Sequence, residues 1–181
     1  PQAATALENY LRTYPESAQK SEALYFAGDA YKQAGEVSKA LDLFKLLEQQ
    51  APSPYRVKAL QQLGKYELEN KNYSEALRYL EPIAQQTRTQ VEEVEVMLGI
   101  LAAHFGLGNY NQAIDASEKL IALGDILPGT TPKALLVKGK SQRLLNQNSE
   151  AEDSFGLLLQ EYTTEEAAEA LLLLALRYQE K

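Results

Sequence analysis

Few side chains in this 181-residue chain have the type and spacing that catalysis or metal binding requires. His104 is the only histidine, so no histidine pair is present to bind a metal or to exchange protons. Cysteine is absent, which excludes disulfides and thiolate metal sites. His104 lies in a stretch with helical periodicity, and we expect its ring to pack between helices rather than to take part in catalysis.

Two short motifs resemble phosphate-binding or nucleotide-binding turns, but each lacks a necessary part. Gly139-Lys140-Ser141 resembles the end of a phosphate-binding loop, but that loop needs a glycine five residues before Gly139, where the chain has Ala134. It also needs a preceding strand, whereas this stretch has a helical pattern. Gly106-Leu107-Gly108 lacks the third glycine of a dinucleotide-binding turn. We interpret it as a turn between two helices.

Acidic residues gather near two predicted helix starts, and the residues concerned are Glu92, Glu93, Glu95, Glu165, Glu166 and Glu169. Carboxylates at these places stabilise the positive end of the helix dipole, and this structural role is the favoured interpretation. A catalytic acid pair is the alternative. The sequence therefore predicts a protein that is not an enzyme and has no cofactor and no bound metal.

Composition limits the kinds of partner that we expect. Hydrophobic residues make up 45% of the chain, enough for a continuous core. The longest apolar run, Ala170 to Tyr178, is interrupted by Arg177 and falls well short of the ~20 residues of a membrane-spanning helix. The net charge of −7 disfavours binding to nucleic acid, which needs a basic surface. We expect no transmembrane segment and no nucleic-acid partner.

An alanine recurs along the chain at nearly constant intervals. The spacings are 37, 36, 37 and 38 residues between the successive members Ala3, Ala40, Ala76, Ala113 and Ala151. Periods of this length are typical of solenoids, in which helical hairpins stack because no single hairpin can bury its own apolar face. The sequence therefore predicts a repeated pair of helices.

The repeat divides the chain into one array over residues 1–181. A half unit at 1–16 precedes full units at 17–53, 54–89, 90–128 and 129–163, and a second half unit covers 164–181. Apolar residues at helical spacing, with glycine or asparagine between the runs, predict ten helices. We expect these helices at 2–14, 18–34, 37–50, 55–70, 73–86, 90–106, 110–123, 132–145, 148–161 and 165–180.

The first full unit carries the most specific pattern. Counted from Ser21, its positions 4, 7, 8, 11, 20, 24, 27 and 32 are Leu24, Ala27, Gly28, Tyr31, Ala40, Phe44, Leu47 and Pro52. In this pattern the chain resembles the tetratricopeptide repeat family. The resemblance implies an all-α, right-handed solenoid of antiparallel helix pairs. It also implies a scaffold that binds a protein or a peptide in the groove lined by the first helix of each unit.

In the family, positions 2, 5, 9 and 12 of the first helices line this groove. The corresponding candidates are Tyr25, Asp29, Lys32, Lys58, Gln61, Lys65, Leu68, Leu98, Ala102, Phe105, Lys133, Leu136, Lys140 and Arg143. We expect five cations among them, Lys58, Lys65, Lys133, Lys140 and Arg143, to surround an apolar floor of Leu68, Leu98, Phe105 and Leu136. Such a groove suits an extended or helical peptide with apolar anchors and an acidic group. The alternative is that the lysines only solvate exposed helix faces.

Near the N-terminus, residues 11–17 followed by 23–31 resemble bacterial envelope members of the family. These include the lipoprotein of the outer-membrane barrel-assembly machine and the periplasmic protein associated with the Tol–Pal system. The resemblance implies a location in the bacterial periplasm or at the outer membrane, with the cytoplasm as the alternative. Because the sequence starts at Pro1 without a methionine, we expect it to be an excised or processed segment.

The last predicted helix, 165–180, is apolar nearly all round, whereas terminal units usually have a polar outer face. We therefore expect either that the natural chain continues or that this helix contacts another molecule, for example in a homodimer. Two further functional hypotheses stay open. The chain could be the non-catalytic helical-repeat arm of a larger envelope enzyme, such as a peptidoglycan hydrolase, or it could be a self-assembly module.

Overall fold

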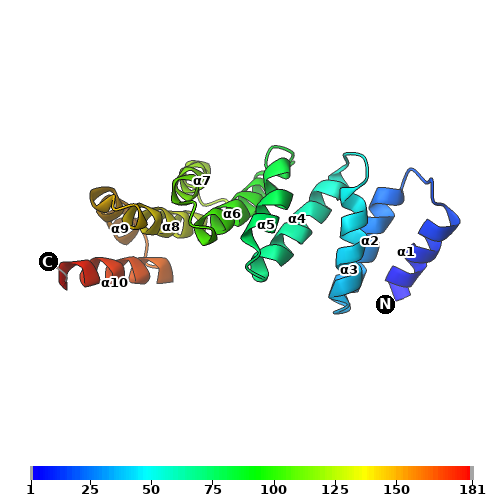
Figure 1. Ribbon diagram of the computed structural model, residues 1–181, viewed down its shortest axis with the longest axis horizontal. Helices are drawn as coiled ribbons and strands as arrows, with labels where there is room; N and C mark the ends of the chain where they lie inside the picture. Colours follow the sequence, from blue (N-terminus) through cyan, green and yellow to red (C-terminus); the bar gives the residue numbers. More distant parts are fainter. Residues whose placement is uncertain (1, 180–181) are drawn as a thin grey trace.

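The computed structural model describes residues 2–179, with side chains through Leu176. Within this range it contains ten α-helices, one short 3₁₀ helix and no strand. The helices are α1 (Gln2–Thr13), α2 (Lys20–Gln33), α3 (Val37–Glu48), α4 (Pro54–Glu69), α5 (Tyr73–Leu80), η1 (Glu81–Ile83), α6 (Gln90–Gly106), α7 (Tyr110–Leu123), α8 (Thr130–Leu144), α9 (Asn148–Glu161) and α10 (Glu165–Gln179). They follow one another along the long axis of the molecule, from α1 at one end to α9 and α10 at the other (Figure 1).

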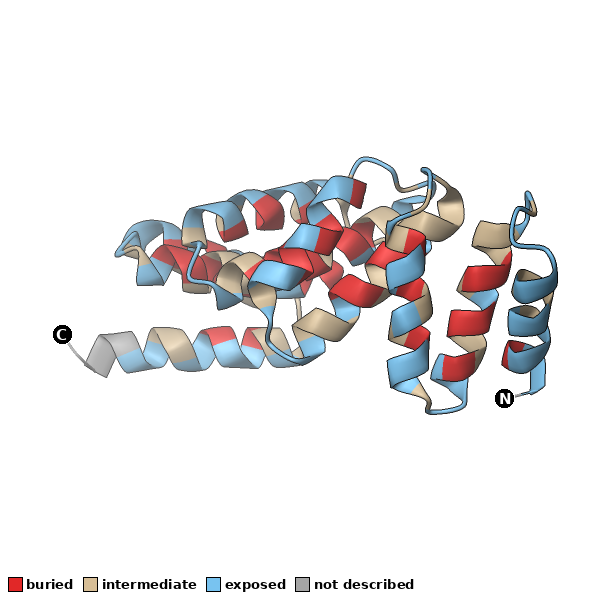
Figure 2. Ribbon diagram, turned by 45° about the vertical axis from the view of Figure 1, so that its right-hand side comes forward, coloured by how far each residue is buried: buried red, intermediate tan, exposed pale blue. Residues whose placement is uncertain are grey.

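This arrangement confirms the predicted all-α solenoid of helix pairs. Each helix packs against the next along the chain, and α2, α4, α6, α8 and α10 also contact one another in series. The hydrophobic core is therefore elongated and continues from one helix pair to the next along the array. Buried residues lie on the facing sides of successive helices along its length (Figure 2).

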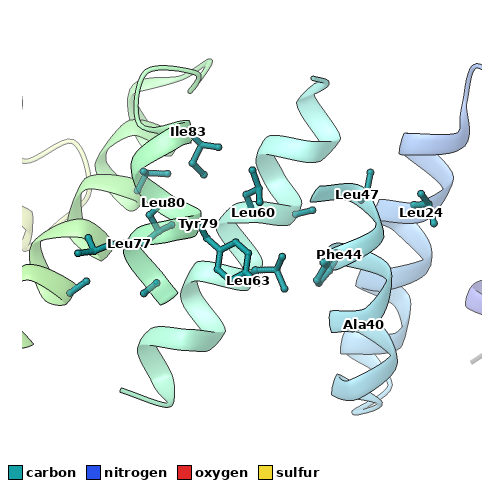
Figure 3. Packing of buried hydrophobic residues seen from close by; sticks show 14 of the residues in the cluster. Leu24, Ala40, Phe44, Leu47, Leu60, Leu63, Leu77, Tyr79, Leu80 and Ile83 are labelled. Atoms are coloured by element: carbon teal, nitrogen blue, oxygen red, sulfur yellow. The ribbon is translucent and has the colours of Figure 1, made fainter. Parts of the chain in front are cut away.

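Close contacts between the two helices of a unit depend on glycine. A Cβ atom on Gly28 would lie 2.6 Å from the Phe44 ring, and one on Gly64 would lie 2.6 Å from Leu80. Gly139 faces Phe155 in the same way. Position 8 of the first helix thus accommodates the large side chain at position 24 of the second helix. Phe44 and Leu80 both lie within one core cluster (Figure 3).

The turns inside the helix pairs each need one residue with left-handed backbone. Gly35, Gly108 and Asn146 supply it in three of these turns, at φ 79°, 77° and 61°, as the glycine and asparagine content predicts. In the turn Asn70-Lys71-Asn72, the positive φ of 59° belongs to Lys71 and not to either asparagine. Composition locates this turn, but it does not indicate which of its residues carries the strain.

The predicted helix boundaries agree with the structure to within two residues, except in α5. The expected helix at 73–86 was wrong in its second half, because α5 ends at Leu80 and Glu81–Ile83 form a 3₁₀ turn. Pro82 explains the difference, since proline lacks the N–H that an α-helix would need there and its ring clashes with the preceding turn. The predicted end of the last helix at residue 180 lies outside the described residues.

The start of α8 differs from the prediction by two residues. We expected it at Pro132, but it begins at Thr130. The Asp125 carboxylate accepts hydrogen bonds from the backbone N–H of Thr130 at 2.8 Å and of Thr131 at 3.4 Å. A carboxylate in this place stabilises the free N–H groups of a first helical turn. This cap extends the helix by the two residues.

The alanine register was wrong in the first half unit. Ala3 was expected at the buried position that Ala40 occupies in the next unit, but Ala3 is exposed and Ala4 is fully buried. Ala4 and Ala40 are 36 residues apart, the same spacing as between Ala40 and Ala76. With Ala4 in the repeated position, Glu8 takes the place of Phe44, and its carboxylate accepts a hydrogen bond from the Tyr31 hydroxyl at 2.7 Å.

Candidate functional site

The first helices of the units form one continuous wall, which we call the inner wall and which consists of α2, α4, α6, α8 and α10. Residues at positions 4 and 8, such as Leu24 and Gly28, are buried against neighbouring helices, and the family resemblance assigns positions 2, 5, 9 and 12 to this wall. The predicted site residues belong to these positions. The structure brings six of them together in one place.

A hollow of about 400 Å³ lies on the inner wall between α4, α6 and α8. We call it the central hollow. Six predicted residues line it, namely Gln61, Lys65, Leu68, Leu98, Ala102 and Lys133. The other lining residues are Gln62, Leu80, Glu95 and Gly99. Apolar side chains and a glycine therefore lie beside amide, ammonium and carboxylate groups, which is the mixture that peptide-binding sites use.

The floor of the central hollow depends on Gly99. A Cβ at Gly99 would lie 2.7 Å from Leu80 and 3.2 Å from Leu68. The missing side chain therefore lets these two leucines approach α6. Leu68 remains half-buried, so part of it faces the hollow.

Some polar side chains at the central hollow already make hydrogen bonds with each other, whereas the two lysine side chains do not. The Gln61 amide donates a hydrogen bond to the Glu95 carboxylate at 2.7 Å, which joins α4 to α6. Lys65 and Lys133 are exposed, and neither ammonium group makes a hydrogen bond or ion pair with another described residue. Two ammonium groups are therefore available here to an acidic ligand.

The predicted residues on α2 lie outside the central hollow. Tyr25 is part of an aromatic cluster, with ring centroids 5.7 Å from Phe26 and 5.9 Å from Tyr55. The Lys58 ammonium lies 5.9 Å from the centre of the Tyr25 ring, within the range of a cation–π contact. Burial, and to a smaller degree the nearby Asp29 carboxylate, raise the pKa of the Tyr25 hydroxyl, so it is neutral at pH 7.

Asp29 and Lys32 are held by neighbouring amides. The Gln33 side chain donates to the Asp29 carboxylate at 2.6 Å, and the Lys32 ammonium donates to the Gln62 side chain at 2.5 Å. The second bond joins α2 to α4 next to the central hollow, because Gln62 is one of its lining residues. Lys32 therefore contacts the edge of the hollow, and neither Lys32 nor Asp29 lines it.

Two members of the expected apolar floor have other surroundings. Leu136 is only 6% exposed and belongs to the core cluster with Phe155 and Leu158. The Phe105 ring is half-buried and lies 5.9 Å from the Tyr110 ring. The exposed floor is therefore shorter than predicted and consists of Leu68, Leu98 and Ala102.

The expected cluster of five cations is divided in the same way. The Lys140 ammonium forms an ion pair with Glu169, and the Arg143 guanidinium donates to the Leu173 carbonyl at 3.4 Å. Both contacts join α8 to α10. Lys65 and Lys133 line the central hollow, and Lys58 lies at the aromatic cluster. Lys140 and Arg143 instead connect α8 to α10.

Sequence reasoning missed Gln62, Leu80 and Gly99, whereas Glu95 lies at groove position 2 of the third unit. Leu80 belongs to a second helix and is a core residue, only 2% exposed. A signal for Gly99 was present, because the third unit has Leu101 where the other units have glycine and places its glycine two residues earlier. A shifted glycine inside a helix indicates that another element approaches it closely.

His104 lies between two units, as we expected. Its side chain is 12% exposed, and Nε2 lies 3.5 Å from Oε1 of Glu81, while Nδ1 is buried and has no hydrogen-bond partner within the described part of the chain. Among the described residues, no group of three or more histidine, aspartate or glutamate side chains could hold a metal ion. No helix within residues 2–179 is long and apolar enough to cross a membrane.

Comparison with known proteins supports the repeat pattern. Residues 1–54, which include α1, α2 and α3, match the model of the tetratricopeptide repeat family. No curated protein matches the chain at a significant level. Repeats of this family generally mediate interactions between proteins, which is the functional class that the match supports.

Proposed function

We propose that this protein binds a segment of another protein on its inner wall, with the central hollow as the main contact. The observation that supports this most is that the Lys65 and Lys133 ammonium groups, which have no partner among the described residues, lie beside Leu68 and Leu98 in one hollow. The preferred ligand is an extended or helical peptide that places an apolar side chain in the hollow and an acidic group near the two lysines.

Two properties of the chain favour this ligand. The protein has a net charge of −7, so uncompensated lysines on one surface form a local positive region in an acidic molecule. In addition, the Gln61–Glu95 hydrogen bond connects α4 to α6 within the hollow, so part of the surface is held in place before a ligand binds. A surface that is already ordered loses less conformational entropy on binding.

The test starts with peptides selected from a random display library on the wild-type chain. We expect the selected peptides to carry an apolar residue near aspartate or glutamate, and their affinity to fall as the salt concentration rises. The Lys65→Glu/Lys133→Glu double variant should bind them at least about tenfold more weakly, which corresponds to about 1.4 kcal/mol. The affinities would be measured by fluorescence anisotropy.

Lys45→Glu is the matched control, because Lys45 is exposed on α3, a second helix, away from the inner wall. This variant changes the net charge in the same direction and should leave the affinity unchanged. If the double variant and Lys45→Glu bind the selected peptides as wild type does, the lysines only solvate the surface and the proposal is wrong.

The location in the bacterial envelope is a separate part of the proposal. It rests on the resemblance of residues 11–17 and 23–31 to envelope members of the family. Fractionation of cells that make the full-length gene product tests it directly. Recovery with periplasmic or outer-membrane marker proteins is expected, and recovery with a cytoplasmic marker would contradict it.

A further inference from the structure

A second hollow, which we call the side hollow, adjoins the central hollow. Its volume is about 100 Å³, and it lies between α2 and α3 of the first full unit and α4 of the second. Its lining residues are Lys32, Val37, Ala40, Leu41, Phe44, Gln62, Lys65, Tyr66 and Glu69. Gln62 and Lys65 also line the central hollow, so the two hollows meet at α4.

A comparison with the next unit explains why this junction is hollow. Val37 is at position 17 of its unit, where the next two units have Tyr73 and Tyr110. At the following junction the Tyr73 ring fills the equivalent place, since a Cβ on Gly106 of α6 would lie 2.5 Å from this ring. Gly106 has the same repeat position as Glu69, which lines the side hollow. A valine in place of tyrosine therefore leaves a space that a ligand side chain can fill.

The wall of the side hollow is largely apolar. Val37 is 41% exposed, and Leu41 and Tyr66 are half-buried, whereas Ala40 and Phe44 are buried. The two buried residues close the hollow towards the core, and the other three leave apolar surface for an entering side chain. An aliphatic side chain is stabilised in such a place, because apolar surface is removed from water on both partners.

Two cations line the polar part of the side hollow. The Lys65 ammonium, which belongs to both hollows, has no hydrogen-bond or ion-pair partner among the described residues. The Lys32 ammonium donates to the Gln62 side chain and retains two further N–H donors. An acidic group between two apolar anchors of a ligand would therefore lie beside Lys65. This charge complementarity and the shared lining residues indicate that one ligand occupies both hollows.

We propose that the side hollow binds a second apolar side chain of the protein segment that occupies the central hollow. This inference rests on the proposed function and specifies its ligand. Packed helices are about 8–10 Å apart, and an extended chain advances about 3.3 Å per residue. The ligand therefore carries an aliphatic residue about three positions from its main apolar anchor, with aspartate or glutamate between them.

The test uses the peptides selected on the wild-type chain. Val37→Tyr should fill the side hollow as Tyr73 fills the next junction, and it should weaken binding by at least about fivefold. General apolar attraction predicts the opposite, because tyrosine adds exposed apolar area. Val91→Tyr is the matched control, since Val91 is 43% exposed near the start of α6 and lines neither hollow.

A peptide whose second apolar residue is replaced by alanine completes a double-mutant cycle. It should bind the wild-type chain at least about fivefold more weakly than the parent peptide does. It should also bind the wild-type chain and Val37→Tyr equally, whereas an effect on folding would weaken both peptides alike. Because Val37 is exposed, the substitution removes no core packing, and a melting temperature no lower than that of wild type would confirm that the variant folds.

Two variants distinguish a failure of this inference from a failure of the proposed function. If Lys65→Glu/Lys133→Glu weakens binding and Val37→Tyr does not, only the inference about the side hollow is wrong. If Lys65→Glu/Lys133→Glu has no effect, both are wrong. Selected peptides with a single apolar anchor would also overturn the inference. A wild-type dimer that sedimentation detects and that Val37→Tyr dissociates would overturn it as well, because a second copy would then occupy the side hollow.

Discussion

At the scale of single residues, glycine has two different roles within the helices of this protein. Gly28, Gly64 and Gly139 face a large side chain of the paired helix and leave no room for a methyl group. Gly156 lies in the middle of α9, is exposed, and has no atom within 4 Å of the place where a Cβ would be. The first role is a packing requirement, whereas Gly156 only weakens its helix.

The contrast predicts opposite effects for the same substitution. Gly64→Ala should destabilise the protein by about 1–3 kcal/mol, because the added methyl group would overlap Leu80. Gly156→Ala should stabilise it by about 0.5–1 kcal/mol, since alanine loses less entropy in a helix. Urea denaturation of the two variants measures both changes. A stabilising Gly64→Ala would show that Leu80 moves away at little cost.

The groove lysines provide a second comparison at this scale. Lys140 forms an ion pair with Glu169, whereas Lys133 has no partner among the described residues. Substitution of Lys140 should therefore disturb the contact between α8 and α10, and substitution of Lys133 should affect only a ligand. For this reason Lys133, and not Lys140, accompanies Lys65 in the binding test.

At the scale of elements, the first half unit shows that the register of a helix depends on its neighbours. Both Ala3 and Ala4 are compatible with the repeat period, and only the packing of α1 on α2 distinguishes them. Ala4 is fully buried, and Leu11, seven residues later, packs partly buried against the same cluster. The hydroxyl of Tyr31 on α2 donates to Glu8, which adds a polar contact to the same face.

A pair of alanine substitutions tests this register. Ala4→Leu should destabilise the protein by about 1–3 kcal/mol, because the larger side chain has no space between α1 and α2. Ala3→Leu should change the stability by no more than about 0.5 kcal/mol, as is usual for an exposed position. Thermal melts followed by circular dichroism compare them. If Ala3→Leu destabilised the protein more than Ala4→Leu, the result would support the register in which Ala3 is buried.

At the scale of the whole molecule, three core clusters follow one another along the array. The first includes Leu24, Phe44 and Leu80, the second includes Val94 and Leu120, and the third includes Phe155 and Leu158. Helix α6 belongs to two of them, since Val96 lies in the first cluster and Val94 in the second. The stability of such an array is approximately a sum of unit and interface contributions.

Leu80 lies at the contact between two units, and its loss should weaken their coupling. Its side chain is 2% exposed and lies against Gly64 of its own unit and Gly99 of the next. Leu80→Ala should destabilise the protein by about 2–5 kcal/mol. The calorimetric unfolding transition should also broaden or divide, because the two halves become less cooperative. Leu46→Ala is the control, as Leu46 is 47% exposed. A single sharp transition in Leu80→Ala would contradict the interpretation.

The sequence by itself determined the repeat, the helix pairs and most helix boundaries, because these depend on local properties. The spacing of apolar residues favours α-helices. Glycine and asparagine permit the turns between them, and the constant period requires that the units stack. The assignment of positions 2, 5, 9 and 12 to the groove came from the resemblance to the tetratricopeptide repeat family. Pro82 also ends α5 for a local reason, because proline lacks the backbone N–H that an α-helix needs.

Only the tertiary structure decided which wall residues are available to a ligand. Leu136 and Leu98 occupy the same repeat position, but Leu136 is buried in the core cluster that contains α9 and α10, and Leu98 lines the central hollow. Lys140 and Lys65 also share a position, but Glu169 of α10 pairs with Lys140 alone. A periodic pattern assigns equal roles to equivalent positions, whereas exposure and pairing depend on which residues lie on the next unit.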